Sequence, residues 1–231
     1  MITAGVDVGN KYTRVVIMKD GQLLSKSMAL SGFDQKTVAA EAYEQALKQA
    51  GLGRNDVNYV VATGAGRKAV AFANTEITEV SADARGAIHL VPTARTIIDV
   101  GVEEGRGIRC DEGGRVIDFC INDKCAAGAG AFIDAMARAL EVKLEELGAL
   151  SLKSTQIVPM NAQCAVFAES EVVSLVHAKL PKPDIARAIH DAIASRIISM
   201  VRRVGVEKDV VLIGGVAYNI GFVDSLRRGL E

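Results

Sequence analysis

Apolar residues gather in short runs that recur in the same order in two halves of the chain. The first half opens with ITAGVDVG and continues with YTRVVIMKDGQLLSKSMAL, in which Asp20-Gly21 separates two apolar runs. The second half opens near residue 96 with TIIDVG and continues with GIRCDEGGRVIDFCI, in which an acidic, glycine-rich turn separates two runs. Apolar runs joined by such turns are typical of β-hairpins. Each half therefore predicts a strand, an Asp-Val-Gly turn and a hairpin, which indicates a duplication.

Helical spacing of apolar residues follows each hairpin. In the first half, KTVAAEAYEQALKQAG predicts a helix that stops at Gly51. NYVVAT then predicts a strand, and we expect a short helical segment from Arg67, a strand near ITEV and a helix starting at Ser81 or Asp83. In the second half we expect a helix after Cys125, an insertion, and a long one-sided helix in PDIARAIHDAIASRIISMVRRVG.

The second half stops earlier than the first. DVVLIGGV predicts a strand, and a helix starting near Asn219 follows it. By analogy with the first half, we expect one further strand and one further helix that this sequence lacks, about 25 to 30 residues at typical element lengths. Pro92 interrupts the pattern between the halves. We therefore expect an N-terminal lobe over residues 1–93 and a C-terminal lobe, with an insertion and an incomplete end, over residues 94–231.

Composition narrows the class of protein. The chain has 231 residues, 49% of them hydrophobic, which is enough for one large or two small domains. The formal net charge is −1 and the positive charges are scattered, so no nucleic-acid footprint is evident. The apolar runs are too short and too often broken by glycine to span a bilayer, and the first residues already form a strand pattern instead of a signal peptide. We expect a soluble, cytoplasmic protein that binds neither nucleic acid nor membrane.

Two Asp-Val-Gly turns in equivalent places predict two loops that hold the same phosphorylated ligand. Glycine lets backbone N–H groups approach phosphate oxygens closely. Asp7 and Asp99 could hold a hydrated magnesium ion or orient a water molecule, and Lys11 could add a positive charge. Glycines also occur simply because a turn is tight; the duplication favours the functional interpretation.

A third glycine turn lies in IGGVAYN, where a flat ring or a ribose could rest against bare backbone before Asn219. The alternative is a plain strand-to-helix connection in which Asn219 caps the helix. The chain has no Walker A loop, which excludes a P-loop NTPase. GAGRKA, from Gly64, matches G-x-G-x-x-A but follows the fourth strand and lacks a ribose-binding acid at the usual distance, so we interpret it as a turn.

The stretch NDKCAAGAGAF places Cys125 just before an alanine and glycine run that leads into a helix. A helix N-terminus favours a thiolate or a bound anion, although a small buried thiol is the commoner use of cysteine. The other cysteines are Cys110, Cys120 and Cys164. No CxxC pair is present, which argues against a zinc ribbon, and a cytoplasmic location favours reduced thiols or ligands over disulfides.

Together these residues resemble the nucleotide-binding duplication shared by acetate and sugar kinases, Hsp70 and actin. The resemblance implies an α/β, ribonuclease H-like ATPase fold in two lobes. Within that superfamily, DVGNKYTRVVI, ATGAGR, NDKCAAGAGAF, CAVFAESEV and VVLIGGVAYN are similar to motifs of two groups. These are the ATP-dependent activators of 2-hydroxyacyl-CoA dehydratases and the ATP-binding subunits of benzoyl-CoA reductase.

The resemblance implies a dimer in which one four-iron, four-sulfur cluster is shared, with Cys125 and Cys164 as the ligands from each chain. Cys110 and Cys120 match no ligand motif and are interpreted as core residues. The resemblance also implies binding of ATP or ADP with Mg²⁺. The implied nucleotide residues are Asp7, Gly9, Asn10 and Lys11 in the first turn, Asp99 and Gly101 in the second, Gly214, Gly215 and Asn219 in the adenosine pocket, and Gly128 and Gly130 where the cluster helix meets the nucleotide.

The second turn departs from the activator pattern. Where activators carry Gly-Gly-Gln-Asp, this chain has Val102, Glu103 and Glu104, with Glu104 as a candidate catalytic acid beside Asp7 and Asp99. This VEEGR form resembles the delta-type subunit of benzoyl-CoA reductase, which pairs with a related ATP-binding subunit.

The first expectation is therefore a reductase subunit in a heterodimer. It would couple ATP hydrolysis to electron transfer from reduced ferredoxin to partner subunits that dearomatise benzoyl-CoA. One alternative is a homodimeric activator of a 2-hydroxyacyl-CoA dehydratase. Another is a nucleotide-responsive assembly subunit that does not hydrolyse ATP.

Overall fold

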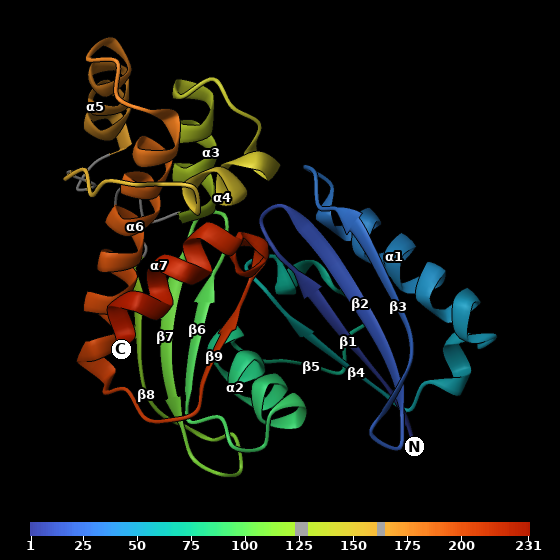
Figure 1. Cartoon of the computed structure of the whole chain (residues 1–231). Helices are drawn as coiled ribbons and strands as arrows, with labels where there is room; N and C mark the ends of the chain where they lie inside the picture. Colours follow the sequence, from blue (N-terminus) through green and yellow to red (C-terminus); the bar gives the residue numbers. More distant parts are fainter. Residues whose placement is uncertain (123–128, 161–164) are drawn as a thin grey trace. The chain divides into compact units, whose positions relative to one another are not determined.

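The computed structural model describes residues 1–122, 129–160 and 165–231. Within these residues the chain forms two compact units, Met1–Ala82 and Asp83–Glu231, and each unit contains one mixed β-sheet (Figure 1). The division between the units falls inside helix α2 (Glu79–Leu90).

The first unit is built on a sheet with the strand order β3-β2-β1-β4-β5. Its strands are β1 (Ile2–Val8), β2 (Tyr12–Lys19), β3 (Gln22–Leu30), β4 (Tyr59–Thr63) and β5 (Thr75–Glu76). β1, β2 and β3 pair antiparallel, whereas β4 runs parallel to both β1 and β5. Asp20 and Gly21 join β2 to β3 with φ values of 51° and 83°, the turn conformation that this pair of residues favours. The predicted hairpin is confirmed.

Helix α1 (Gln35–Ala50) covers one face of β2 and β3 (Figure 1). The Asp34 side chain caps its first turn by accepting from the Thr37 backbone N–H at 3.1 Å, and the helix ends at Gly51, whose φ of 69° is left-handed. Ser25 and Ser27 of β3 donate hydrogen bonds to helix carbonyls at 2.7 and 2.6 Å. These bonds satisfy two buried hydroxyls and fix the helix on the sheet.

The expected elements that follow β4 need correction. The 3₁₀ segment η2 (Arg67–Ala69) forms as predicted, and η1 (Arg54–Asp56) precedes β4. However, the strand near ITEV is only Thr75–Glu76, and helix α2 begins at Glu79, before Ser81 and Asp83. Thr78 supplies the start signal, because its hydroxyl accepts from the Ser81 N–H at 3.3 Å.

The second unit repeats the strand order of the first as β8-β7-β6-β9. Its strands are β6 (Thr96–Val100), β7 (Gly105–Cys110), β8 (Val116–Asn122) and β9 (Val210–Ile213). β6, β7 and β8 pair antiparallel, and β9 runs parallel to β6. The helical segments are α3 (Ala129–Ala139), α4 (Leu144–Ser151), α5 (Ala165–His177), α6 (Lys182–Val204), η3 (Gly215–Tyr218) and α7 (Ile220–Leu230). β6 corresponds to β1 and β9 to β4, so the duplicated α/β fold is confirmed.

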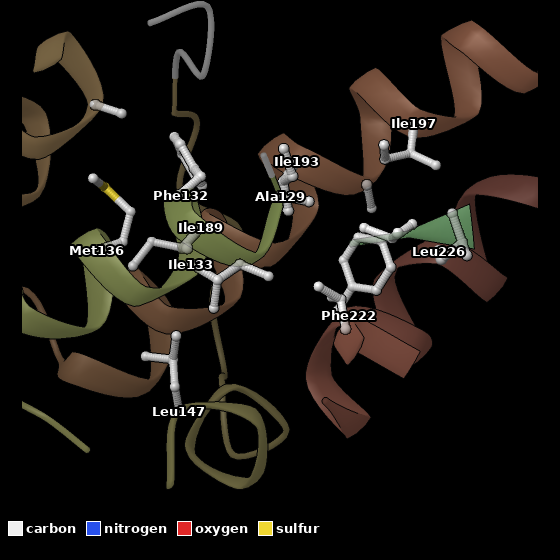
Figure 2. Close-up of a cluster of buried hydrophobic side chains, with 14 of the residues drawn as sticks. Ala129, Phe132, Ile133, Met136, Leu147, Ile189, Ile193, Ile197, Phe222 and Leu226 are labelled. Carbon is white, nitrogen blue, oxygen red and sulfur yellow. The ribbon is translucent and has the colours of Figure 1, made fainter. Parts of the chain in front are cut away.

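Helix α6 organises the core of the second unit. The face predicted from sequence is buried: Ile185, Ile189, Ile193, Ile197, Met200 and Val204. Figure 2 shows side chains of α6 beside Phe132 and Met136 of α3 and Phe222 of α7. A Cβ added at Gly107 on β7 would lie 3.1 Å from a Val201 methyl, so this glycine lets helix and strand approach closely. No described helix is long and apolar enough to span a membrane.

His190 lies on α6 where the start of α7 packs against it. The imidazole is fully buried, and a Cβ added at Gly221 would lie 2.8 Å from the ring and 2.2 Å from the Ser151 hydroxyl of α4. Neither ring nitrogen has a hydrogen-bond partner among the described residues. Burial lowers the pKa of His190 to about 4, and the nearby Asp191 charge only partly opposes this.

We predict that His190 makes the fold acid-sensitive. The unfolded chain binds this proton near pH 6.5 and the folded protein only near pH 4, so the free energy of unfolding falls as pH drops through that window. The loss should approach about 3 kcal/mol at pH 4. His190→Leu should flatten this part of the urea-unfolding pH profile without destabilising the protein at pH 7, because no hydrogen bond to a described residue is lost. An unchanged slope in the variant would contradict the assignment.

Candidate functional site

Each of the two candidate carboxylates stands near the end of the first strand of its sheet, opposite an arginine. The register pairs Asp7 of β1 with Arg14 of β2 and Asp99 of β6 with Arg106 of β7. Arg14 donates to the Asp7 carboxylate at 3.4 Å, and Arg106 donates to the Asp99 carboxylate at 2.5 Å. Cross-strand pairs of opposite charge stabilise a sheet locally. The two arginines were not among the residues predicted from sequence.

The turns after the two strands close in the same way. The Gly9 N–H donates to the Tyr12 carbonyl at 3.0 Å, and the Gly101 N–H donates to the Glu104 carbonyl at 2.9 Å. In the first turn, the Ser31 hydroxyl donates to the Gly9 carbonyl at 2.6 Å. Both closures leave a short loop between antiparallel strands, in the places where the sequence predicts phosphate-binding turns.

Asn10 and Lys11 are exposed in the first of these loops. The Ser31 N–H donates to the Lys11 carbonyl at 3.1 Å, so the backbone of the loop is anchored. The Lys11 ammonium lies 5.7 Å from the centre of the Tyr12 ring, within the range of a cation–π contact. A positive charge is thus held beside the first turn.

A glycine that follows the neighbouring parallel strand lies close to each carboxylate. Gly64 follows β4 and Gly214 follows β9, with φ values of 93° and 90°. A Cβ added at Gly64 would lie 2.6 Å from Asp7 Oδ1, and one added at Gly214 would lie 2.5 Å from Asp99 Oδ1. Each would also lie 2.4 Å from the carbonyl oxygen of the residue that follows the aspartate. Only glycine fits either position, both for its φ and for the contact.

These two glycines also start equivalent turns. The Arg67 N–H donates to the Gly64 carbonyl and the Ala217 N–H donates to the Gly214 carbonyl, both at 3.2 Å. Gly64, interpreted from sequence only as a turn, is therefore the structural counterpart of Gly214. The shared context of a parallel strand followed by a glycine turn, once in each half, is the signal that could have revealed it.

The two carboxylates differ in their surroundings. The side chains of Asp7 and Arg14 are 37% and 47% exposed, whereas those of Asp99 and Arg106 are 10% and 9% exposed. Arg106 also donates to Glu104 at 2.5 Å, so one guanidinium bridges two acids. Glu104, predicted as a catalytic acid, is thus engaged by Arg106.

Helix α3 begins against the second turn. The Gly130 N–H donates to the Gly101 carbonyl at 3.1 Å, and the Ala131 N–H donates to the Val102 carbonyl at 2.9 Å. A Cβ added at Gly130 would lie 2.9 Å from Val102 Cα, so the contact depends on glycine. The start of α3 is therefore bonded to the loop that follows Asp99. Three predicted site residues, Gly128, Cys125 and Cys164, lie outside the described residues.

The predicted adenosine residues lie at the start of α7. Gly214 and Gly215 are exposed, and no atom would meet a Cβ added at Gly215 within 4 Å. The Asn219 side-chain oxygen accepts from the N–H groups of Gly221 and Phe222, both at 3.1 Å. The alternative interpretation of Asn219 as a helix cap is therefore confirmed.

The described cysteines behave as core thiols. Cys110 is fully buried, and burial raises the pKa of its thiol. Cys120 is half-buried and packs against the core of the second unit. Within the described part of the chain, no group of three or more His, Cys, Asp or Glu side chains could hold a metal ion.

Residues 4–231 match the BadF/BadG/BcrA/BcrD ATPase family. The chain belongs to this family. It is 40% identical, over its whole length and 87% of the relative, to the 2-hydroxyisocaproyl-CoA dehydratase activator of Clostridioides difficile. It is 34% identical, again over its whole length and 83% of the relative, to one of the subunits of the benzoyl-CoA reductase of Thauera aromatica.

A solved structure agrees with this assignment. The activator of the 2-hydroxyisocaproyl-CoA dehydratase from Clostridium difficile, with bound ADPNP, superposes with a TM-score of 0.89 at 39% identity. The match covers 99% of this chain and 85% of that one. The actin-like ATPase fold is thereby confirmed. The higher identity to the activator than to the reductase protein favours the alternative, not the first expectation drawn from VEEGR.

We predict that Gly64→Ala and Gly214→Ala destabilise the protein more than Gly21→Ala. Gly21 has a similar φ of 83° but meets nothing within 4 Å, so its variant measures the conformational cost alone, about 1 kcal/mol. The other two variants add a clash, for a total of about 2 to 5 kcal/mol. Urea unfolding measures the difference. Equal costs at the three positions would show that the close approach is not a constraint.

Proposed function

We propose that this protein is an ATP-dependent activator of a 2-hydroxyacyl-CoA dehydratase, acting as a homodimer that injects an electron into its partner enzyme. One observation carries the proposal: an aspartate turn and a glycine turn occur together in each half of the chain. The chain is also 40% identical to such an activator. The relative with bound ADPNP supports a nucleotide as the ligand of these turns.

In this proposal the phosphates of ATP or ADP meet backbone N–H groups of Asn10 and Lys11. They lie against the bare backbone of Gly9 and Gly101, whose own N–H groups close the two turns. The exposed Gly214 and Gly215 receive the adenosine, with Asn219 fixing the helix start beside them. Asp7 and Asp99 are the carboxylates that would hold hydrated Mg²⁺. Mg²⁺, when bound, neutralises phosphate charge. At the exposed Gly215, where a Cβ would meet nothing within 4 Å, the bare backbone leaves room for close approach of a ligand.

Cys125 and Cys164 are the proposed ligands of a four-iron, four-sulfur cluster. Such a cluster takes four thiolates, so two per chain require a second copy related by two-fold symmetry. When bound, the cluster supplies a one-electron carrier. The hydrogen bonds from α3 to Gly101 and Val102 join the second turn to the helix that follows Cys125. A change in that turn between ATP and ADP states would therefore move the start of α3.

A benzoyl-CoA reductase subunit is the second candidate, favoured by the VEEGR form of the second turn. It would pair with a related ATP-binding chain and transfer electrons from reduced ferredoxin in every turnover. The bridged arrangement of Glu104 and Arg106 is the structural correlate of that sequence form.

The two candidates differ in how much of this protein the partner enzyme requires. We predict that the anaerobically purified protein, with ATP and a low-potential reductant, activates a 2-hydroxyacyl-CoA dehydratase at one activator dimer per many dehydratase molecules. A dehydratase freed of its own activator is the substrate of this assay, and product per activator is the readout. If the protein instead sustains only benzoyl-CoA reduction, in proportion to ATP consumed, the second candidate is correct.

We predict about four irons per dimer, lost in both Cys125→Ser and Cys164→Ser. Cys120→Ser is the matched control, because Cys120 lies on β8 and packs against the core. Iron and sulfide analysis, with size-exclusion chromatography under the same conditions, gives the readout. A folded, dimeric wild-type protein without iron would contradict the cluster assignment while leaving nucleotide binding open.

A further inference from the structure

Tyr218 is an exposed aromatic residue at the end of η3, in the segment that follows the glycine turn after β9. The residue is 91% exposed, whereas Val216 of the same segment is 7% exposed. No hydrogen bond or ring contact joins the Tyr218 side chain to another residue in the described part of the chain. The segment therefore turns one side chain into the core of the second unit and presents an aromatic ring to solvent.

The geometry of η3 places Tyr218 on the same face as Gly215. In a 3₁₀ helix the side chains of residues i and i+3 lie one above the other, and η3 runs from Gly215 to Tyr218. Helical side chains also lean toward the N-terminus of their segment, which for Tyr218 is toward Gly215. Gly215 is exposed, and a Cβ added there would meet nothing within 4 Å. An aromatic ring thus stands one turn after open, bare backbone.

The backbone that carries this ring is fixed from several sides. The Asn219 N–H donates to the Val216 carbonyl at 2.9 Å, and the Asn219 side chain caps α7 with two hydrogen bonds of 3.1 Å. Helix α4 supports the cap, because a Cβ added at Gly148 would lie 2.7 Å from Asn219 Oδ1. A ring on a backbone that is already ordered loses little conformational freedom when a ligand binds to it.

We propose that Tyr218 stacks on the base of the bound nucleotide and so makes this turn prefer a nucleotide over an inorganic phosphate. The inference deepens the proposed function and rests on it, because that function places adenosine at Gly214 and Gly215. A base that lies on the bare backbone of Gly215 has the Tyr218 ring beside it. Stacking on an aromatic side chain strengthens binding by about 5- to 150-fold per base. Every base has a π-face, so Tyr218 selects for the presence of a base and not for adenine alone.

The test compares calorimetric binding of ADP and of inorganic pyrophosphate, both with Mg²⁺. Tyr218→Ala should weaken ADP binding about 5- to 150-fold and change pyrophosphate binding less than about twofold, because pyrophosphate has no base. Tyr218→Phe keeps the ring, so its ADP affinity should stay within about twofold of wild type. The urea midpoint of Tyr218→Ala should match wild type, because the side chain is exposed. Undiminished ADP binding in Tyr218→Ala, or an equal loss for both ligands, would overturn the proposal.

A matched control and an optical readout complete the set. Tyr59→Ala removes a 43% exposed tyrosine of β4 and should change ADP affinity less than about twofold. The chain has four tyrosines and no tryptophan, so tyrosine dominates its ultraviolet emission. ADP should lower this emission more in wild type than in Tyr218→Phe, and an equal decrease in both would contradict stacking. If wild-type protein binds no ADP, the proposed function itself fails; if ADP binds equally well without the ring, only this inference fails.

Discussion

The close approach of a glycine to an aspartate is the constraint on which both halves of this protein depend. In each sheet the chain leaves a parallel strand with positive φ and passes so near the carboxylate that a Cβ would fall 2.5 or 2.6 Å from its oxygen. The aspartate is held from the other side by a cross-strand arginine. A glycine with positive φ, a carboxylate paired across the strands and a closed hairpin turn therefore occur together in both halves.

In the second half, the turn after the aspartate also contacts a helix. The turn accepts hydrogen bonds from the N–H groups of Gly130 and Ala131, at the start of α3. Gly130 has no side chain to hold the helix away from Val102. The Asp99 turn is thus continuous, through backbone bonds, with the helix that follows Cys125. In the proposed activator, these bonds connect a nucleotide-binding turn to the helix next to a cluster ligand.

Much of the fold can be predicted from short stretches of the sequence. The Asp20-Gly21 hairpin, the stop of α1 at Gly51 and the one-sided apolar face of α6 are encoded by residues close together in the chain. The start of α2 is not evident from sequence because Thr78, which caps it, lies inside ITEV, the stretch interpreted as a strand. The sequence-based starts at Ser81 and Asp83 were too late.

The site was predicted less completely, because its partners are distant in sequence. The aspartates and glycines of the turns stand out by themselves, but the Asp99–Arg106 and Asp7–Arg14 pairs require the strand register. The role of Gly64 requires the parallel pairing of β4 with β1. The preference for a reductase subunit rested on VEEGR alone, whereas identity over the whole chain favours the activators.

Hydrogen–deuterium exchange with and without Mg-ADP tests the central claim most directly. If both aspartate turns and both glycine turns serve one nucleotide, amides in 9–12, 64–67, 101–104 and 214–217 should exchange more slowly when it is bound. Exchange at the Asp20-Gly21 hairpin should not change. Protection confined to one half, or absent from all four segments although ADP is bound, would contradict the account.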